Sequence, residues 1–408
     1  MVWTTLITAL VLSFVAPIVV IYFIIIFDLY WLLRILYMLF YMVISYWRYR
    51  QSLKIDWGRK YQEVRGWKKI HHLIIIATYR ESLGVLKDTF RSIIKSNYPL
   101  KKCIVVLAGE ERDKVNFQNI ASQLEREFGS LFLRFLITIH PKDIEGEVAG
   151  KGSNIAWAGR RAQELIDGLE ISYDDIIVTT LDCDSVLHPQ YLSYLTYSFL
   201  TDPKPTRTSY QPVAIFNNNI WQAPAFTRIV SYSTTFWLLS EQVRPERMHT
   251  FSSHSMSFRA LVDIDFWQTD IVTEDSRICL QCLMHYDGDY KVKPLYIPIS
   301  MDVVLGKNFW QTIKAQYVQQ RRWAYGIENF PYMIWNFFRN KKMPFIIKFR
   351  YIFNQLEGVY SWATAPILIF ILGHLPAWVV SQGEYTSIAV SYTHLRAHET
   401  SLHLVCRL

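Results

Sequence analysis

Two carboxylates separated by a single residue follow a short apolar run in the middle of the chain. The run is Asp175-Ile-Ile-Val-Thr-Thr-Leu181, and Asp182-Cys183-Asp184 comes directly after it. At the end of a buried strand, such a pair can offer hard oxygen ligands to Mg²⁺ or Mn²⁺, an ion that usually keeps waters and bridges to diphosphate oxygens. An Asp-x-Asp (DxD) pattern recurs by chance, so its position after a strand is what gives it weight.

A second acidic group, Thr273-Glu274-Asp275, precedes a predicted helix over Ser276–Leu283. A hydroxyl nucleophile needs a base to take its proton, and a positioned Asp can do this, contributing about 10²–10⁴-fold. One such carboxylate with a metal-held leaving group predicts inversion, as with the water-activating base of inverting glycoside hydrolases. The alternative is a helix cap, in which Thr273 or Asp275 accepts bonds from free backbone N–H groups.

A third group, Gln319-Gln320-Arg321-Arg322-Trp323, closes a predicted amphipathic helix over Phe309–Trp323. Residues four apart share a helix face, so Gln319 and Trp323 point the same way, with Arg322 beside them. A Trp ring can stack on the C–H face of a sugar, and Arg and Gln can bond to hydroxyl or phosphate oxygens. A compatible alternative is an interfacial helix with Trp among lipid headgroups.

Two smaller motifs lie nearer the N-terminus. Thr78-Tyr79-Arg80-Glu81 follows a predicted strand, where a base or ribose could be held, and Gly150-Lys151-Gly152-Ser153-Asn154 opens a helix whose Lys could reach a phosphate. The second motif is not a P-loop, because Glu145 occupies the position of the first Gly and Gly152 that of the metal-binding Ser or Thr.

Alternating short strands and helices must position these groups. The strands are predicted at His72–Ala77, Cys103–Ala108, Leu131–Ile139 and Asp175–Leu181, and the helices at Leu83–Lys95, Lys114–Phe128 and Asn154–Asp167. This order predicts a parallel sheet with right-handed crossovers, in which ligands bind beyond the carboxyl ends of the strands. The motifs after the first and fourth strands should therefore meet in one crevice.

Long apolar blocks flank this region, and basic residues flank the blocks. Thr5–Phe27 is long enough to cross a hydrocarbon core of about 30 Å, and because the apolar run continues to Trp47 we predict two spans that turn near Asp28, with Arg34 reaching outward to the membrane surface. The last block, Tyr351–Val380, holds one or two spans. The formal net charge of +8 follows the positive-inside pattern, which predicts an integral membrane protein with a cytoplasmic catalytic domain and no nucleic-acid partner.

The five cysteines form no regularly spaced framework, so reduced thiols are expected. Cys279 and Cys282 make a single C-x-x-C, which cannot supply four zinc ligands. The tail from Ser391 has no periodicity and is treated as a non-native extension, beyond which the natural chain may continue.

With these motifs in this order, the chain resembles the membrane-bound family 2 glycosyltransferases, the group that includes cellulose, hyaluronan and chitin synthases. The resemblance implies a GT-A, Rossmann-like catalytic domain, so the expected fold is α/β with a mainly parallel central sheet, flanked by transmembrane helices and an interfacial amphipathic helix. It also implies Mg²⁺ or Mn²⁺ as cofactor and, as partners, a nucleotide-sugar donor, a glycan or lipid-linked acceptor and the bilayer.

The resemblance assigns roles to individual residues. The donor would be bound by Thr78, Tyr79, Glu81, Lys151, Asn154 and Asp182. Asp184 would bind the metal, Asp275 would be the base with Glu274 beside it, and Gln319, Arg322 and Trp323 (the QxxRW motif) would frame the diphosphate and the acceptor end.

Two stretches depart from the family pattern. The family has an Asp-rich turn after the second strand, where a carboxylate meets uracil, and here Glu110 would substitute for it. The acceptor-side stretch, often Cys- and Gly-containing, is Phe251-Ser-Ser-His-Ser-Met-Ser257; its His254 could contact an acceptor or be structural.

The predicted organisation runs from an N-terminal transmembrane hairpin to a C-terminal transmembrane region. Its parts are the hairpin (1–50), a basic linker (51–70), the catalytic domain (71–305), interfacial helices (306–345), the C-terminal membrane region (346–390) and the tail (391–408). The expected function is inverting, metal-dependent transfer from a UDP-sugar to a growing polysaccharide, with coupled export through the protein's own spans. A non-processive transferase acting on a lipid-linked acceptor and an inactive membrane scaffold are the alternatives.

Overall fold

The computed structural model describes residues 1–245 and 247–381, which form two compact units. One unit consists of Met1–Tyr41 with the described part of Lys348–Leu408, and the other of Met42–Ile347. Each unit has a hydrophobic core of its own, so each is described by itself.

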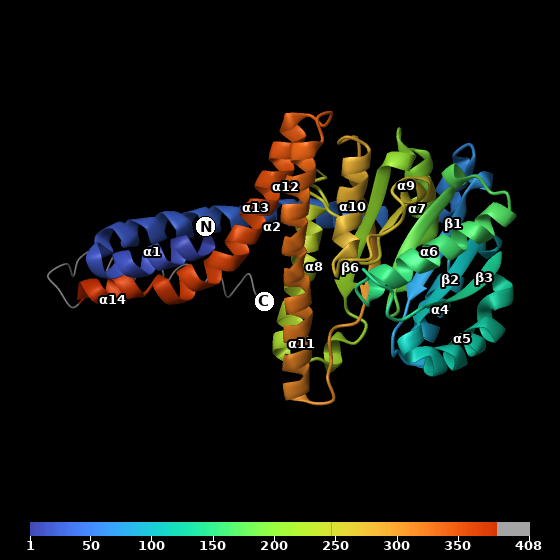
Figure 1. Cartoon of the computed structure of the whole chain (residues 1–408), viewed down its shortest axis with the longest axis horizontal. Helices are drawn as coiled ribbons and strands as arrows, with labels where there is room; N and C mark the ends of the chain where they lie inside the picture. The colour runs from blue at the N-terminus through green and yellow to red at the C-terminus, as the bar shows by residue number, and fades with distance from the viewer. Residues whose placement is uncertain (246, 382–408) are drawn as a thin grey trace. The chain divides into compact units, whose positions relative to one another are not determined.

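The larger unit is built on one eight-stranded sheet in the order β3-β2-β1-β4-β7-β6-β8-β5 (Figure 1). The strands are β1 (His71–Ala77), β2 (Cys103–Glu110), β3 (Arg134–His140), β4 (Ile176–Asp182), β5 (Val186–Leu187), β6 (Thr208–Phe216), β7 (Ser255–Ser257) and β8 (Lys291–Met301).

The first half of the sheet is parallel, as predicted. β1 pairs with β2 on one side and with β4 on the other, with His72 opposite Cys103 and His71 opposite Ile176. These strands are buried on both faces, which explains their continuous runs of Ile, Val and Leu. The carboxyl ends of β1, β2 and β4 therefore lie side by side.

The second half makes the sheet mixed, which the prediction of a mainly parallel sheet did not anticipate. β7 runs antiparallel to both β4 and β6, and β5 antiparallel to β8. β7 is only Ser-Met-Ser, and its first side chain is bonded inside the core: Ser255 Oγ lies 2.7 Å from Thr179 Oγ1 and 2.9 Å from the Tyr191 hydroxyl. A strand this short has no apolar periodicity to read.

Helices cover both faces of the sheet. They are α3 (Trp57–Lys60), α4 (Leu83–Ile94), α5 (Lys114–Phe128), α6 (Lys151–Gly168), α7 (Tyr191–Leu200), α8 (Ala225–Glu241), α9 (Phe258–Asp263), α10 (Glu274–His285), α11 (Phe309–Ala324) and α12 (Asn329–Arg339). Side chains of α4, α5 and α7 share one core with alternate residues of the parallel strands, and α6 packs on β1, β2 and β3 (Figure 1).

Helices α8 and α11 have reversed polarity for helices of a water-soluble domain. α11 buries Thr312 and Gln316, while Trp310 is 75% exposed and Tyr317 65% exposed. α8, which contacts α11, likewise buries hydroxyl side chains such as Thr227. Their polar faces therefore point into the protein and their aromatic side chains outward.

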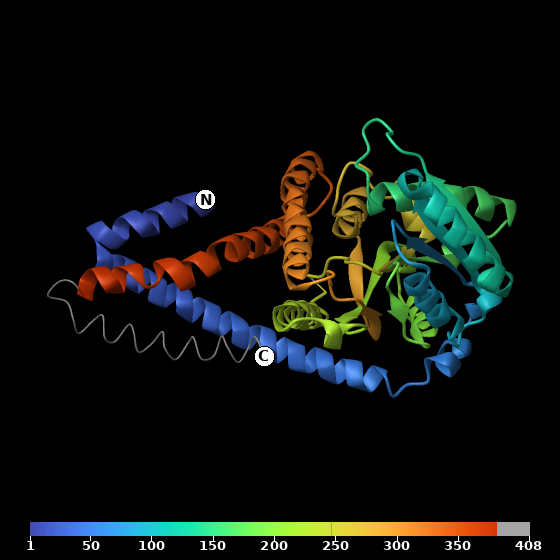
Figure 2. The ribbon, with the colours of Figure 1, turned by 90° about the horizontal axis from the view of Figure 1, so that it is seen from below.

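The smaller unit consists of apolar helices. They are α1 (Val2–Val15), α2 (Pro17–Ser52, whose last residues belong to the larger unit), α13 (Phe345–Ile367), the π-helical turn η10 (Leu368–Leu372) and α14 (Leu375–Ser381). Pro17–Ser52 and Phe345–Ser381 are long and apolar enough to cross a membrane. Figure 2 shows the C-terminal helices in red beside the blue N-terminal ones, which agrees with their shared core.

The N-terminal turn is not where the sequence predicted it. The chain breaks at Ala16, before Pro17, and Asp28 lies inside α2. Proline is tolerated in the first turn of a helix and disfavours helical backbone in the residue before it, so Pro17 ends α1 and starts α2.

Arg34 also differs from the prediction that it reaches outward. It forms an ion pair with Glu357 of α13, and the Tyr30 hydroxyl donates to the same carboxylate at 2.7 Å. The predicted tail from Ser391 lies outside the described residues.

Candidate active site

Lys151 lies at the centre of a cluster of acidic side chains. Its Nζ is 2.7 Å from Asp182 Oδ1, 3.1 Å from Asp275 Oδ2 and 3.9 Å from Glu274 Oε1. Burial alone would lower the pKa of Lys151, but the three carboxylates raise it well above its usual value. The ammonium therefore holds together the DxD motif and the Thr273-Glu274-Asp275 motif, which are about ninety residues apart in the sequence.

Two helix N-termini and one strand end produce this cluster. Lys151 is the first residue of α6, Glu274 and Asp275 open α10, and Asp182 ends β4. The two helices approach closely at Gly152, where an added Cβ would lie 3.1 Å from the Glu274 Cβ and 3.3 Å from the backbone oxygen of Gln268. A larger residue at Gly152 would push the helices apart.

Asp182 is held from two further sides. The Ser252 hydroxyl donates to Asp182 Oδ2, and the charge of Arg322 acts on the same carboxylate. Burial would raise the pKa of Asp182, but Lys151, Ser252 and Arg322 together bring it below its usual value. The charge of Arg322 in the QxxRW motif thus acts on the cluster, while a single cleft shared by all the predicted motifs stays a prediction.

Glu274, expected beside the base, lies deeper in the cluster than Asp275. Only 4% of its side chain is exposed, and it lies beneath Lys151. Burial and the neighbouring Asp275 raise the pKa of Glu274 to about 8, so it is neutral at pH 7. A protonated, enclosed carboxyl group is poorly placed to take a proton, whereas Asp275 is 21% exposed.

Asp184 lies in a second acidic group, on the other side of Cys183. Its Oδ2 accepts a bond from the backbone N–H of Asp302 at 3.2 Å, just beyond β8. Burial, followed by the charges of Asp182 and Asp302, raises the pKa of Asp184 to about 7. Glu81 also belongs to this group. Burial and the charge of Asp302 raise its pKa, and a hydrogen bond with the Cys183 thiol partly offsets them.

This second group fits a divalent cation only in part. Among residues 1–245 and 247–381, no three His, Cys, Asp or Glu side chains are arranged to hold a metal ion. The crowding that raises the pKa of Asp184 is nevertheless what a cation would relieve. Mg²⁺ is usually bound through one or two carboxylates and substrate phosphates. Asp184 therefore fits as one ligand of a site that a diphosphate completes.

Mn²⁺ binding should weaken at acid pH for this reason. Below a pKa of about 7 the Asp184 carboxylate is protonated, and a proton must leave before the ion binds, so the affinity should fall by about tenfold for each pH unit below 7 and level off above 7.5. Titration of Mn²⁺ in the presence of a nucleoside diphosphate at pH 5.5–8.5 measures this. Asp184→Asn should abolish the pH dependence, and Asp174→Asn, in a surface ion pair with Arg259, should preserve it.

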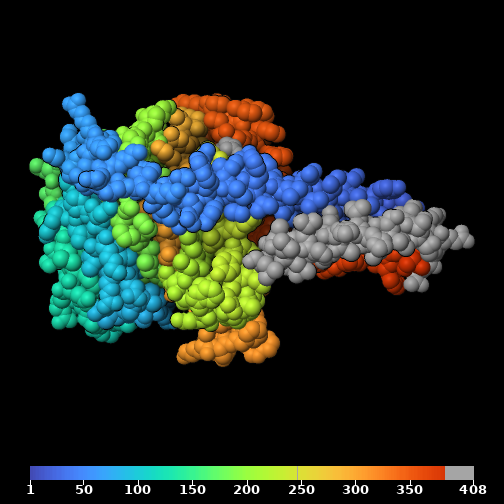
Figure 3. Space-filling view, turned by 180° about the vertical axis from the view of Figure 1, so that it is seen from behind, coloured from blue at the N-terminus to red at the C-terminus, as the bar shows by residue number. Residues whose placement is uncertain are grey.

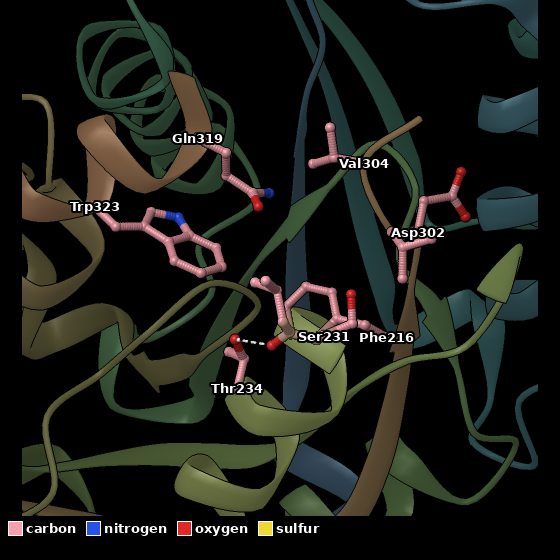
Figure 4. Close-up of a pocket in the computed structure, with 9 residues that line it drawn as sticks. Phe216, Ser231, Thr234, Asp302, Val304, Gln319 and Trp323 are labelled. Carbon is pink, nitrogen blue, oxygen red and sulfur yellow. Dashed lines mark hydrogen bonds between the residues drawn. The ribbon is translucent and has the colours of Figure 1, made fainter. Parts of the chain in front are cut away.

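A small hollow opens beside Asp302 (Figure 4). Gln319 and Trp323 of α11 line it on one side, and Ser231 and Thr234 of α8 on another. Gln319 and Trp323 share a face, as predicted from their spacing. The free volume is about 10 Å³, enough for about one water molecule.

The turn after β1 carries the predicted nucleoside-binding residues. The backbone N–H of Thr78 donates to Ala108 O at 2.9 Å, and the guanidinium of Arg112 lies 4.5 Å from the centre of the Tyr79 ring. Arg112 Nε in turn donates to Glu110 Oε2 at 2.8 Å. Tyr79 and Glu110 are therefore neighbours through Arg112.

Three other residues are placed as structural elements. Asn154 is 1% exposed, and its Nδ2 donates to Ala108 O at 3.0 Å, which ties α6 to β2; its contact with a donor stays a prediction. Thr273 makes no side-chain cap bond, so the alternative of a Thr273 helix cap is wrong. His254 is 1% exposed, with Nδ1 2.9 Å from Phe251 O, and burial lowers its pKa.

Two residues of the site were missed in the sequence. Ser252 bonds to Asp182 from the stretch considered for acceptor binding, and Asp302 follows β8. Asp302 had one usable signal, since it directly follows the apolar run that ends at Met301.

Comparisons with known proteins show what this chain is similar to. The sequence model of glycosyl transferase family group 2 matches residues 177–393. A poly-beta-1,6-N-acetyl-D-glucosamine synthase of Staphylococcus aureus (strain MSSA476) is 24% identical over 255 residues, which are 62% of this chain and 53% of that protein. The chain thus spans about half the length of such relatives.

A second relative is matched over more of the chain. The synthase of the same name from Staphylococcus epidermidis (strain ATCC 35984) is 24% identical over 378 residues, covering 90% of this chain and 76% of that protein. Among solved structures, a mannosyltransferase of Pyrobaculum calidifontis in complex with GDP-Man and Mn²⁺ aligns with a TM-score of 0.49 at 14% identity, over 91% of this chain and 94% of that one.

Proposed function

The chain belongs to glycosyl transferase family group 2, and on this premise we propose that it transfers a sugar from a UDP-sugar to a growing polysaccharide, with inversion and with the help of a divalent metal ion. The observation that carries the proposal is the position of Lys151 between Asp182 and Asp275. A donor-binding carboxylate and a base must lie within one sugar ring of each other, and a single ammonium group contacts both.

Lys151 also supplies a reason for the base to act only when the donor is bound. In the free protein its ammonium contacts both oxygens of Asp275, at 3.2 and 3.1 Å. A donor diphosphate is a stronger competitor for an ammonium than a single carboxylate, because it carries more charge. Binding of the diphosphate would draw Lys151 away and leave Asp275 free to accept the proton of the acceptor hydroxyl.

The remaining charges suit a departing nucleoside diphosphate. Arg322 would bond to its phosphate oxygens from α11, and Asp184 would hold the divalent ion there. When bound, that ion offsets the charge that builds on the leaving group, an effect of several kcal/mol. Asp275 takes the proton as the acceptor oxygen attacks from the face opposite the leaving group, which gives inversion.

The relatives narrow the proposed donor and acceptor. Both are named as synthases of a polymer of N-acetylglucosamine, so we take UDP-N-acetylglucosamine as the first donor to test. The half-buried ring of Trp323, which lines the hollow, supports an acceptor that is itself a sugar, because a Trp face packs on sugar C–H groups.

The reversed polarity of α11 supports a position at a membrane surface. The first residues of α11, in orange, project beyond the yellow-green α8 in Figure 3. Phe309 and Trp310 in this segment are 52% and 75% exposed, as expected for side chains that enter the headgroup layer. With the two apolar segments, this supports an integral membrane enzyme whose catalytic unit lies in the cytoplasm and whose product is exported through the membrane.

A screen of purified full-length protein tests the proposal. The protein in detergent is incubated with labelled UDP-sugars and Mn²⁺ or Mg²⁺, and product length is read on a gel. Long products from UDP-N-acetylglucosamine support a processive synthase, whereas single additions to a lipid support the non-processive alternative. If no donor were turned over, and neither Asp184→Asn nor Asp275→Asn changed donor binding, the alternative of an inactive membrane scaffold would be supported.

A further inference from the structure

A buried arginine joins the helix of the base to the turn that follows the helix of the QxxRW motif. Arg277 of α10 is 6% exposed. Its Nε donates to Asn329 Oδ1 at 2.7 Å and its Nη2 to Glu328 O at 3.2 Å. Its Nη1 donates to Gln268 Oε1 at 2.7 Å. Each of the three guanidinium nitrogens thus donates to a different residue of a neighbouring segment.

The two residues beyond α10 belong to one turn. Glu328 ends the 3₁₀ turn η9 (Tyr325–Glu328), and Asn329 begins α12. This turn follows Arg322 and Trp323 directly, and short 3₁₀ segments between helices are common sites of bending. Arg277 therefore binds the chain at the turn between α11 and α12, where a bend would change the direction of the motif helix.

Further contacts strengthen the same junction. The guanidinium lies 3.9 Å from the centre of the Tyr332 ring, on α12. Asn329 Nδ2 donates back to Ser276 Oγ at 2.8 Å, and Ser276 Oγ donates to Thr273 O at 3.1 Å. The network thus extends to the residue before Glu274.

The charge of Arg277 has no close acid partner. No ion pair of the guanidinium is found among the described residues; the charges of Tyr332, Asp270 and Glu328 only partly offset burial, the largest cause of its lowered pKa. Burying a charge costs free energy of folding, and replacing a buried ionic group by apolar residues often leaves a protein equally stable or more stable. Stability alone is therefore a weak reason for an arginine here, and its geometry is the stronger one.

The helix geometry gives Arg277 and Asp275 different directions. Two residues apart on an α-helix means about 200° of rotation, so the side chains leave opposite sides of α10. Asp275 meets Lys151, while Arg277 meets η9. The first turn of α10 therefore carries the base on one side and, on the other side, the arginine that binds η9, the turn after the motif helix.

We propose that Arg277 is a positioning residue that sets the spacing between Asp275 and the Arg322–Trp323 pair, and so aligns the acceptor hydroxyl with the base. The alignment rests on the proposed function; the clamp between α10 and η9 does not. Arg277 touches none of the groups assigned to the donor, so donor affinity should be independent of it.

Two variants and one matched control test this in the full-length protein. Arg277→Lys keeps the charge but loses the three-way fork, and Asn329→Ala removes one partner of the fork. Arg259→Lys is the control, since Arg259, on the surface of α9, also donates a hydrogen bond to a side chain (Asp174, 3.0 Å) and lies close to an aromatic ring (Tyr173, 5.0 Å).

Three readouts separate positioning from simple destabilisation. Hydrogen exchange at residues 325–329 should rise by about tenfold in Arg277→Lys and Asn329→Ala, because local opening there loses charge-assisted bonds. The kcat of Mn²⁺-dependent transfer from UDP-N-acetylglucosamine should fall by about 10- to 100-fold, since small misplacements of reacting groups have effects of this size. The Kd for UDP should change by less than about twofold, because neither variant alters a residue assigned to donor binding.

The outcomes are distinct. Unchanged exchange at 325–329, a loss of UDP affinity that matches the loss of kcat, or an equal effect of Arg259→Lys would overturn the proposal. If the parent protein transferred no sugar from any donor while exchange still rose in Arg277→Lys, the clamp would stand and the proposed function would fall.

Discussion

Asp275→Asn abolishes sugar transfer while donor binding stays close to that of the parent protein: this is the result we expect with the largest effect. The amide cannot accept the hydroxyl proton, and a positioned base contributes about 10²–10⁴-fold to the rate. Asparagine keeps the size of the side chain and can still accept a bond from Lys151 through its oxygen, so the cluster should survive. The measurement is kcat with UDP-N-acetylglucosamine and Mn²⁺, beside the Kd for UDP.

The control for this variant is Asp265→Asn. Asp265 is 87% exposed, contacts only Arg160 at 3.5 Å and has positive φ, a conformation that asparagine tolerates. It should leave kcat unchanged. If Asp275→Asn made product as fast as the parent, the assignment of Asp275 as the base would be wrong.

The second large effect is expected for Lys151→Met. Removing the ammonium leaves Asp182 and Asp275 without their shared counter-charge, and breaking a buried ion pair by removing one partner costs about 3–5 kcal/mol. The free energy of unfolding should therefore fall by about 3 kcal/mol near pH 7. The Kd for the donor should rise by at least about 100-fold, because a charged contact to phosphate is lost as well.

Denaturant unfolding and donor titration measure these two changes. Lys151→Arg restores the charge and should recover stability better than catalysis, because the planar guanidinium cannot take the place of a compact ammonium between two carboxylates. Lys142→Met, at an exposed lysine on the loop before α6, is the control and should change neither quantity. A Lys151→Met protein as stable as the parent and with unaltered donor affinity would refute the central role of this residue.

Much of the site could be predicted because the parallel strands have a strong signal. Ile74, Val105 and Val178 belong to continuous β-branched runs, and once these are parallel neighbours, the residues after them must meet. The spacing of Gln319 and Trp323 likewise determined their common face. The α/β class, the glycosyltransferase family and the enzyme class predicted from the sequence are confirmed, while the roles of the single site residues stay predictions.

The features that were missed depend on contacts that no local pattern announces. Ser255 lies in a strand of three residues that is stabilised by hydroxyl bonds inside the core, so it has neither length nor apolar alternation. Asp302 reaches Asp184 because β5, two residues after Asp184, runs antiparallel to β8 with Val186 opposite Ser300. Arg277 appeared as one charged residue on an ordinary helix, and only its partners on α12 give it meaning.

The N-terminal turn was misplaced for a simpler reason. The predicted turn follows from the charge of Asp28 within an apolar run, but proline is the stronger signal for a break between helices, and Pro17 is where α2 begins. A carboxylate within an apolar helix can be accommodated by the neighbouring helices, whereas the missing N–H and the ring of proline cannot be masked.

The hollow between α8 and α11, with room for about one water molecule, has a kinetic consequence. A pyranose ring is many times larger, so Trp323 must swing aside before any sugar can occupy this space. The observed rate constant of sugar binding should then level off at high sugar concentration, at the rate constant with which Trp323 swings aside. It should not keep rising in proportion to the sugar concentration.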